Sequence, residues 1–448
     1  MAAPHGEVID PARAVRATPR RTVAAWASWD WGSSAYSSIV TSFVFAPYLA
    51  NAVAADRPPG SLSGSTWLGI AMFVAGVAVA AIAPITGQRA DAGGRRRRSL
   101  GLWTALTIGA TLGLFFVRDE YSYLWLGLVL LAAGSVFMEF AGVSYNAMLQ
   151  QISTPANIGR ISGIGWASGY VGGIFVLLIS FVLFISPDVG LFGVTAEGGM
   201  KYRVLAIVVA IWFAVFAIPA LVLVPEIPPT TTIDRVGFLA SYKVLAGDVR
   251  TLFRADRNSV YFLLASALYR DGLAAVFSFG AVLAVSVYGL SASDVIIFGV
   301  AANIVAAIGA FAAGFVEDRV GPKPIITVSL TGLIVTATIL LFAHGATMFW
   351  VFGLLLCLWV GPAQSSSRSF LARLAPEGRE GQMFGLYATT GRAVSFLAPG
   401  LFALLSGVFN SDRMGIIGIA LVLLMGAIAL WRVNPPPRHQ PADLGAIG

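Results

Sequence analysis

Long apolar runs separated by short polar segments recur along nearly the whole chain. Each run is close to the roughly 20 residues that a helix needs to cross a hydrocarbon core about 30 Å thick. Backbone polar groups find no partners in lipid, so such runs must be helical. The pattern predicts twelve spans, at residues 26–50, 64–87, 99–117, 122–149, 161–186, 203–224, 259–287, 293–316, 324–344, 348–371, 383–408 and 414–432.

Composition supports this interpretation. The 448 residues are 57% hydrophobic and only 11% charged, whereas a soluble chain carries about 25% charged residues. The first apolar run contains Asp30 and is too long for the apolar part of a signal peptide, so we expect it to be a retained span. The lipid bilayer is therefore the expected partner of most of the surface.

The distribution of Lys and Arg predicts the orientation, because short cytoplasmic loops retain positive charge. If both termini are cytoplasmic, most of these residues fall in inner segments, and the outer loops hold only Arg57, Arg118, Lys201, Arg203 and Arg413. This topology also explains the net charge of +7 without a nucleic-acid partner. The excess of Arg over Lys indicates a bacterial source, and hence the cell (inner) membrane.

Polar segments divide the chain into five parts. We expect a disordered cytoplasmic N-terminus at 1–22, a six-helix bundle at 23–224, a cytoplasmic linker at 225–258, a second six-helix bundle at 259–432 and a disordered tail at 433–448. Parallel repeats of six spans are a known transporter construction.

An internal repeat supports the two halves. The second span is followed by GQRADAGGRRRR and the eighth by GFVEDRVGPK, which share a glycine, an aspartate and basic residues at similar spacing. The residues concerned are Gly87, Asp91, Gly94, Arg95, Arg96, Gly314, Asp318, Arg319 and Gly321.

This loop resembles the signature loop of the major facilitator superfamily. The resemblance implies that the glycine lets two helices approach closely, and that the aspartate pairs with an arginine and a facing helix N-terminus to latch the cytoplasmic side shut. The expected pairs are Asp91 with Arg95 or Arg96, and Asp318 with Arg319. An ordinary basic inner loop is the alternative, which explains neither the spacing nor its repetition.

Three further segments resemble the vacuole-effluxer, or "unknown major facilitator", family: AWASWDWGSSAYSSIVTSFVFAPY, YFLLASALYRDG and GPAQSSSRSFLARLAPEGREGQMFGLYATTGRAVSF. Fungal members of that family are associated with amino-acid efflux from the vacuole, whereas bacterial members are poorly defined. The resemblance implies an all-α membrane fold of twelve helices in two pseudo-symmetric six-helix bundles, and a transport activity.

The fifth span carries Gly165, Gly169, Gly172 and Gly173. Drug/proton antiporters have a glycine-rich helix here, but their pattern includes a proline where this chain has Tyr170. Tight helix packing is therefore the preferred explanation of these glycines.

Charged residues inside the spans are the candidate site. Each costs about 2.5 to 3.5 kcal/mol at the middle of a lone helix, so they should face one another or a watery cavity. With the small polar residues on the same helical faces, the candidates for binding substrate or protons are Asp30, Ser34, Glu139, Asn146, Arg270, Asp271, Gln364, Arg368 and Arg392. Because neighbours on a helix point about 100° apart, Arg270 and Asp271 are expected to pair with other helices.

Both signs of charge in one cavity fit a zwitterion such as an amino acid. Arginine binds a carboxylate with two parallel hydrogen bonds, and an aspartate or glutamate binds an ammonium group or a proton. For Asp30, Asp271 and Arg368, a structural or gating role stays open beside substrate binding. For Glu139 and Arg392, substrate or proton binding is favoured.

The sequence therefore predicts a monomeric secondary transporter of a small polar solute, driven by protons through alternating access, since no nucleotide-binding loop is present. A drug or metabolite exporter of the same fold is the alternative. A non-transporting receptor or a membrane-embedded enzyme is a remote one, because neither a metal cluster nor a nucleophile motif is visible. We expect no enzymatic activity, no cofactor and no metal.

Overall fold

The structure is a computed structural model that describes residues 19–226, 247 and 256–435. Most of the expected linker, the first eighteen residues and the end of the expected tail lie outside these residues. The expected disorder of the N-terminus is wrong for residues 20–22, because the first helix begins at Arg20. For residues 1–18 and 436–448 the expectation concerns parts of the chain that are not described.

Helices form at all twelve predicted spans. The first half comprises α1 (Arg20–Ala35), η2 (Tyr36–Phe43), α2 (Phe45–Tyr48), η3 (Leu49–Val53), α3 (Gly64–Ala92), α4 (Arg96–Gly113), α5 (Leu124–Ala147), α6 (Ile158–Ser180), η7 (Phe181–Ile185) and α7 (Met200–Leu223). The second half comprises α9 (Arg257–Ser286), α10 (Ala292–Val320), α11 (Pro322–Phe342), α12 (Ala346–Leu374), α13 (Glu380–Val394), α14 (Leu397–Phe409) and α15 (Asp412–Trp431). Eleven helical segments in the described ranges are long and apolar enough to cross a membrane.

The first predicted span is not among these eleven, because it is not the single helix that its apolar run predicts. Its residues 20–53 are divided among α1, η2, α2 and η3, with an irregular residue at Val44 (φ −123°, ψ −65°). Pro47 accounts for the interruption, because a proline ring clashes with the carbonyl group four residues earlier and donates no hydrogen bond. The predicted span is confirmed, but its regularity is not.

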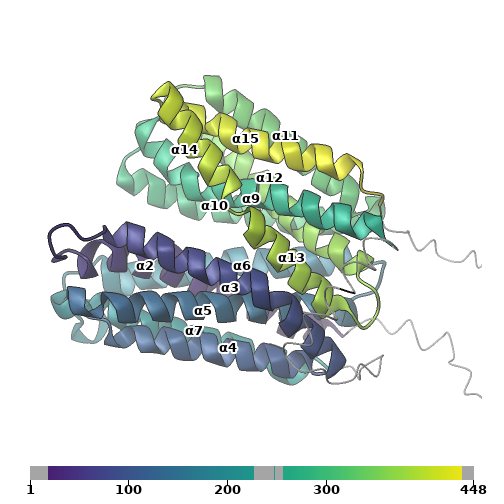
Figure 1. Ribbon diagram of the computed structural model, residues 1–448, viewed down its shortest axis with the longest axis horizontal. Helices are drawn as coiled ribbons and strands as arrows, with labels where there is room; N and C mark the ends of the chain where they lie inside the picture. The colour runs from purple at the N-terminus through teal and green to yellow at the C-terminus, as the bar shows by residue number, and fades with distance from the viewer. Residues whose placement is uncertain (1–18, 227–246, 248–255, 436–448) are drawn as a thin grey trace, which may run out of the picture.

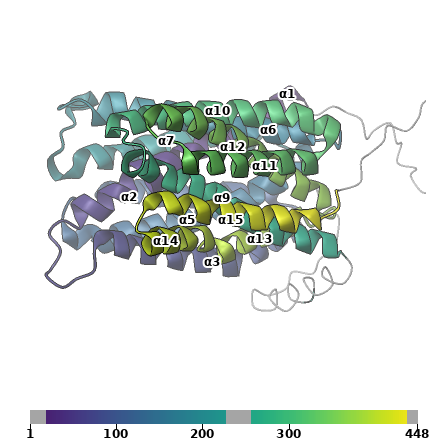
Figure 2. The same cartoon turned by 90° about the horizontal axis from the view of Figure 1, so that it is seen from above.

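The two halves lie as two layers of roughly parallel helices (Figure 1). Figure 2 shows the same helices running along the long axis of the molecule. Two crossed pairs join the layers: α10 of the second half packs on α6 of the first, and α13 packs on α3. We call the end of the molecule at which α7 ends and α9 begins the linker end.

Glycines allow both crossed pairs to approach at the linker end. A Cβ atom on Gly87 would overlap the carbonyl oxygen of Gly381, and one on Gly314 would lie 2.8 Å from the carbonyl oxygen of Gly159. No larger residue fits without separating the backbones. These are the glycines of the repeated loop, so the repeat in the sequence marks one close approach in each of the two helix pairs.

The eleventh span is divided between α13 and α14. Pro399 lies in the first turn of α14, where its ring opposes continuation of the preceding helix. The carboxylate of Asp271 on α9 accepts a hydrogen bond from the backbone N–H of Ala398 (2.7 Å) and so caps α14. The break is therefore held from a neighbouring helix.

Candidate functional site

The first repeated loop contacts the start of α13. Oδ1 of Asp91 lies 2.8 Å from Nε of Arg96, and its Oδ2 accepts a hydrogen bond from the backbone N–H of Gln382 (2.9 Å). Arg96 also pairs with Glu380. Of the two arginines proposed as partners of Asp91, Arg96 is therefore the one that pairs. An acid at a helix N-terminus is favoured by the unsatisfied N–H groups there.

Gly94 and Arg95 shape this loop, and the backbone N–H of Gly94 donates to the carbonyl oxygen of Asp91 (3.0 Å). Arg95 is exposed at the start of α4, and Gly94 has φ +57°, which a glycine adopts without strain. Gly94 therefore sets the turn that places Asp91 and Arg96 side by side.

The second repeated loop makes the corresponding contact with α6. Asp318 accepts hydrogen bonds from the backbone N–H groups of Gly159 (2.9 Å) and Arg160 (3.2 Å). The expected pair of Asp318 with Arg319 is wrong: Arg319 is exposed, and no ion pair joins the two in the described part of the chain. Gly321, at φ +89°, provides the turn into α11.

Glu317 is a residue that sequence reasoning missed. It is fully buried on α10, accepts hydrogen bonds from Ser366 (2.6 Å) and Ser369 on α12, and lies 3.8 Å from Arg373. The signal was present, because GPAQSSSRSF places a run of serines on α12. Its acceptor on another helix could not be identified without the fold.

We predict that Asp318→Asn weakens transport whereas Arg319→Gln does not. The first change weakens two backbone hydrogen bonds to a charged acceptor, each worth about 1.5 to 3 kcal/mol, while the second alters an exposed side chain. Initial transport rates of the two variants, at matched amounts of reconstituted protein, provide the measurement. Equal losses would contradict the assignment.

Asp30 and Arg368 form an ion pair between the halves. Their Oδ2 and Nη1 atoms lie 3.1 Å apart, and Asp30 also accepts a hydrogen bond from Tyr145 (2.8 Å). Arg368 is only 5% exposed, and its other nitrogens donate to the hydroxyl (3.0 Å) and carbonyl (2.6 Å) oxygens of Ser162 on α6. Asn146 accepts a longer bond from Arg368 (3.4 Å). All three nitrogens of Arg368 are thus engaged.

Glu139 and Arg392 form a second ion pair between the halves. They come from α5 and α13, and Arg392 lies about 18 Å along α13 at 1.5 Å per residue. The side chain of Glu139 is 34% exposed and that of Arg392 32%. This pair therefore lies near the middle of the span and remains open, in contrast to the buried pair of Asp30 and Arg368.

Arg270 and Asp271 on α9 contact different elements, as their helical spacing predicts. Nη1 of Arg270 donates to the carbonyl oxygen of Tyr387 (3.1 Å), and its guanidinium lies 3.7 Å from the centre of the Tyr387 ring. Asp271 instead caps α14. This contact gives Asp271 a structural role, which was one of the two alternatives for it.

The uncharged candidates are less informative. Ser34 donates to the carbonyl oxygen of Trp31 within its own helix (2.7 Å) and lies where a Cβ atom on Gly172 would be 2.9 Å from its Oγ. Gln364 is half-buried on α12. The close approach at Gly172 supports packing as the role of the fifth-span glycines.

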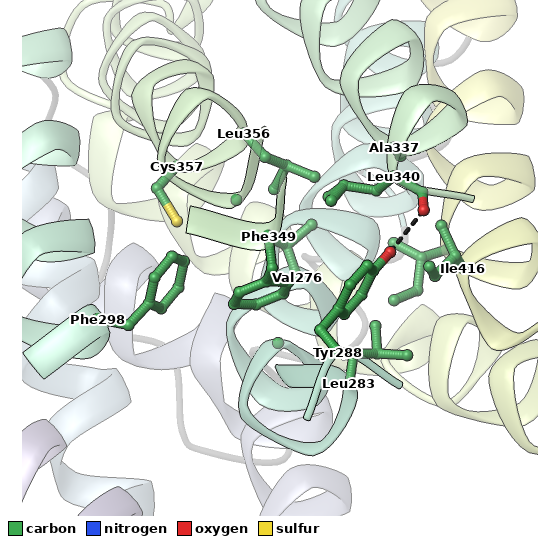
Figure 3. Close-up of a pocket in the computed structure, with 13 residues that line it drawn as sticks. Val276, Leu283, Tyr288, Phe298, Ala337, Leu340, Phe349, Leu356, Cys357 and Ile416 are labelled. Carbon is green, nitrogen blue, oxygen red and sulfur yellow. Dashed lines mark hydrogen bonds between the residues drawn. The ribbon is translucent and has the colours of Figure 1, made fainter. Parts of the chain in front are cut away.

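An apolar cavity lies inside the second half, away from these charges (Figure 3). Its lining includes Phe298, Phe349, Leu356 and Cys357, and the hydroxyl of Tyr288 already donates to the carbonyl oxygen of Leu340 (2.5 Å). Such a lining offers a polar solute no partners. The charged residues between the halves are therefore the candidate site.

The profile of the vacuole effluxer Atg22-like family matches residues 150–437, well over half of the chain. The chain belongs to this family. The match includes α6 and every helix of the second half, and thus Arg270, Arg368 and Arg392.

This Atg22-like protein is similar to a bacterial MFS-type transporter and to a fungal autophagy-related protein. It is 24% identical over 414 residues to an uncharacterized MFS-type transporter, YxiO, of Bacillus subtilis (strain 168), covering 90% of this chain and 93% of that one. It is 26% identical over 299 residues to autophagy-related protein 22 of Cryptococcus neoformans var. neoformans, covering 61% of this chain but only 52% of the fungal protein. The chain thus spans about half the length of that fungal relative.

The fold is that of the major facilitator superfamily. The solved structure of the proton:xylose symporter XylE bound to 6-bromo-6-deoxy-D-glucose is similar, with a TM-score of 0.71 and 12% identity over 93% of this chain and 95% of that one. At this identity the likeness shows the fold alone. The Atg22-like chain is therefore a multi-pass membrane protein of two six-helix bundles and an MFS transporter, a class that acts on solutes by transport.

Proposed function

We propose that this protein is a proton-coupled secondary transporter of an amino acid or related zwitterion. Membership of a transporter family gives the class of activity, and the charges between the halves support the choice of solute. In the proposed cycle the two halves rock around these charges, so that the solute reaches one side of the membrane and then the other.

The ion pair of Glu139 with Arg392 carries the proposal. It joins α5 to α13 near the middle of the span and is about one-third exposed, so a solute can reach both side chains. A zwitterion can exchange partners with the pair, its carboxylate binding Arg392 and its ammonium group binding Glu139. This exchange removes a direct bond between the halves while keeping each charge neutralised.

The same pair supports proton coupling. A proton on Glu139 removes the charge that holds Arg392, so protonation and substrate binding both release the contact between α5 and α13. Two ligands that act on one contact are coupled through it. The proposed proton site is therefore Glu139.

The proposed setting is the cell membrane, with the linker end in the cytoplasm and the protein acting as a monomer. Arg95, Arg96, Arg97 and Arg98 at the start of α4 lie at this end, which favours the cytoplasmic side. The contacts of α3 with α13 and of α10 with α6 then close the cytoplasmic side in this conformation.

Counterflow in proteoliposomes tests the proposal. A panel of amino acids and of lipophilic drug cations is offered with and without a pH gradient, and substrate addition is followed by internal pH. We expect an amino acid to move and to carry protons with it. Movement of drug cations alone would support the exporter alternative and overturn the proposal.

Variants of Glu139 and Arg392 provide a second test of the proposed function. Since a hydrogen bond to a charged group is worth about 1.5 to 3 kcal/mol, Glu139→Gln and Arg392→Ala should each lower transport about tenfold or more. The matched control is Glu197→Gln, at an exposed residue in the short turn that precedes α7. If both variants of the pair transport like the control, the site lies elsewhere.

A further inference from the structure

Arg270 differs from the other charged residues of the spans in its partners. Asp30 pairs with Arg368 and Glu139 with Arg392, and Asp271 caps a helix. Among the described residues no carboxylate lies within ion-pair distance of Arg270, and its contacts are a carbonyl oxygen and the ring of Tyr387. Its charge is therefore left for another partner.

Its hydrogen-bond donors lead to the same conclusion. A guanidinium has five N–H donors, and Arg270 gives one of its nitrogens, Nη1, to the carbonyl oxygen of Tyr387. Arg368, by contrast, uses all three nitrogens within the protein. The two arginines are thus satisfied within the protein to very different degrees: Arg368 is buried, whereas Arg270 is half-buried and can donate to a ligand.

The guanidinium of Arg270 is held in a fixed place. The hydroxyl of Tyr387 is hydrogen-bonded to Ser367 (2.6 Å), and Ser367 is bonded in turn to the buried Tyr269 (2.7 Å). The ring below the guanidinium therefore cannot rotate freely. Stacking on a ring leaves the edge of an arginine free for bidentate hydrogen bonds.

Its place also relates it to the proposed substrate site. A Cβ atom on Gly391 would lie 3.2 Å from Nη1 of Arg270, so glycine provides the space in which the guanidinium lies against α13. The next residue is Arg392, which pairs with Glu139. Arg270 of α9 thus contacts α13 at the residue before Arg392, within the same helical turn.

We propose that Arg270 binds the carboxylate of the transported solute, with Tyr387 as the residue that positions it. This assignment rests on the proposed function and narrows its substrate class, because a solute must then carry a carboxylate to be recognised. Arg392 shares this carboxylate once the ammonium group of the solute has bound Glu139, while Arg270 supplies the charge that selects an acid over its amide.

Substrate analogues test the proposal. The fastest amino acid of the panel is compared in counterflow with its carboxamide, its decarboxylated amine and its deaminated acid. We expect the amino acid and the deaminated acid to compete, and the carboxamide and the amine to fail. Arg270→Gln should weaken competition by the acid about tenfold or more and abolish the preference for acid over amide, with partial recovery in Arg270→Lys.

Tyr387→Leu removes the ring and should weaken the same preference, while Tyr387→Phe keeps the ring and should retain most of it. Arg257→Gln, at an exposed arginine at the start of α9, is the matched control and should behave like the wild-type protein. An Arg270→Gln variant that still distinguishes acid from amide would overturn the assignment.

A binding measurement separates this proposal from the proposed function. The melting temperature of the purified protein is followed with millimolar propionate or propionamide, which requires no transport. Propionate alone should stabilise the wild-type protein, and the effect should vanish in Arg270→Gln. If amino acids are not transported but this shift is seen, the proposed function fails and the carboxylate site stands; a shift that is absent, or equal in the variant, refutes the site.

Discussion

Replacing Gly87 by valine is expected to abolish transport by holding α3 and α13 apart. A Cβ atom at this position overlaps the carbonyl oxygen of Gly381, and backbone atoms cannot rotate away as the end of a side chain can. Overpacking of this kind costs about 1 to 3 kcal/mol or more. The closed linker end should therefore become about tenfold to a hundredfold less populated, and Asp91 should lose its contact with Gln382.

Gly69→Val is the matched control, because Gly69 lies on the same helix with no neighbouring atom within 4 Å of an added Cβ. Opening is measured by thiol labelling of Ala375→Cys, a buried position at the end of α12, in a Cys357→Ala background. Labelling should accelerate in Gly87→Val and remain slow in Gly69→Val. Slow labelling with normal transport in both would show that this close approach does not control closure.

Replacing Arg368 by methionine is expected to lower both stability and transport. The change leaves the carboxylate of Asp30 between the halves without its arginine, and removing one partner of a buried ion pair costs about 3 to 5 kcal/mol. It also leaves the hydroxyl of Ser162 and the side chain of Asn146 without a donor from Arg368. The melting temperature in detergent should fall well below that of the wild-type protein.

A double variant separates the ion pair from the other contacts of Arg368. Asp30→Asn combined with Arg368→Met removes the unpaired charge, so part of the lost stability should return. Arg98→Met, at an exposed arginine, should melt with the wild-type protein. If the double variant is no more stable than Arg368→Met alone, the hydrogen bonds to Ser162 account for the loss and the ion pair does not.

The fold could be predicted largely from the sequence because the interactions that form each span lie within that span. Each span must satisfy its own backbone in lipid, so apolar length alone locates helices such as α5 and α7. The repeated loop identified two close approaches of the halves, at Gly87 and Gly314, because only glycine allows such contact. The interruption at Val44 was missed, although Pro47 could have indicated it.

The pairing of charges could not be predicted, because it depends on distant helices. Burial cost implied that Asp30 and Arg368 need partners, but not that they need each other across 338 positions of sequence. The choice of Arg319 for Asp318 failed for the same reason: the acid contacts the start of α6, where backbone N–H groups are unpaired. Glu317 was overlooked because its serine partners lie on another helix.

The break between α13 and α14 has a mechanical consequence. α13 packs against α3 and α5 of the first half and against α9 of its own half, whereas α14 packs against α15 and α9 of its own half. Asp271 of α9 caps α14, and Arg270 of α9 donates to α13, so both segments are attached to their own half, and α13 in addition contacts the first half. The eleventh span should therefore act as a hinged lever: α13, with Arg392 near the hinge, bends when its contact with α3 opens, while α14 stays at rest against α9 and α15.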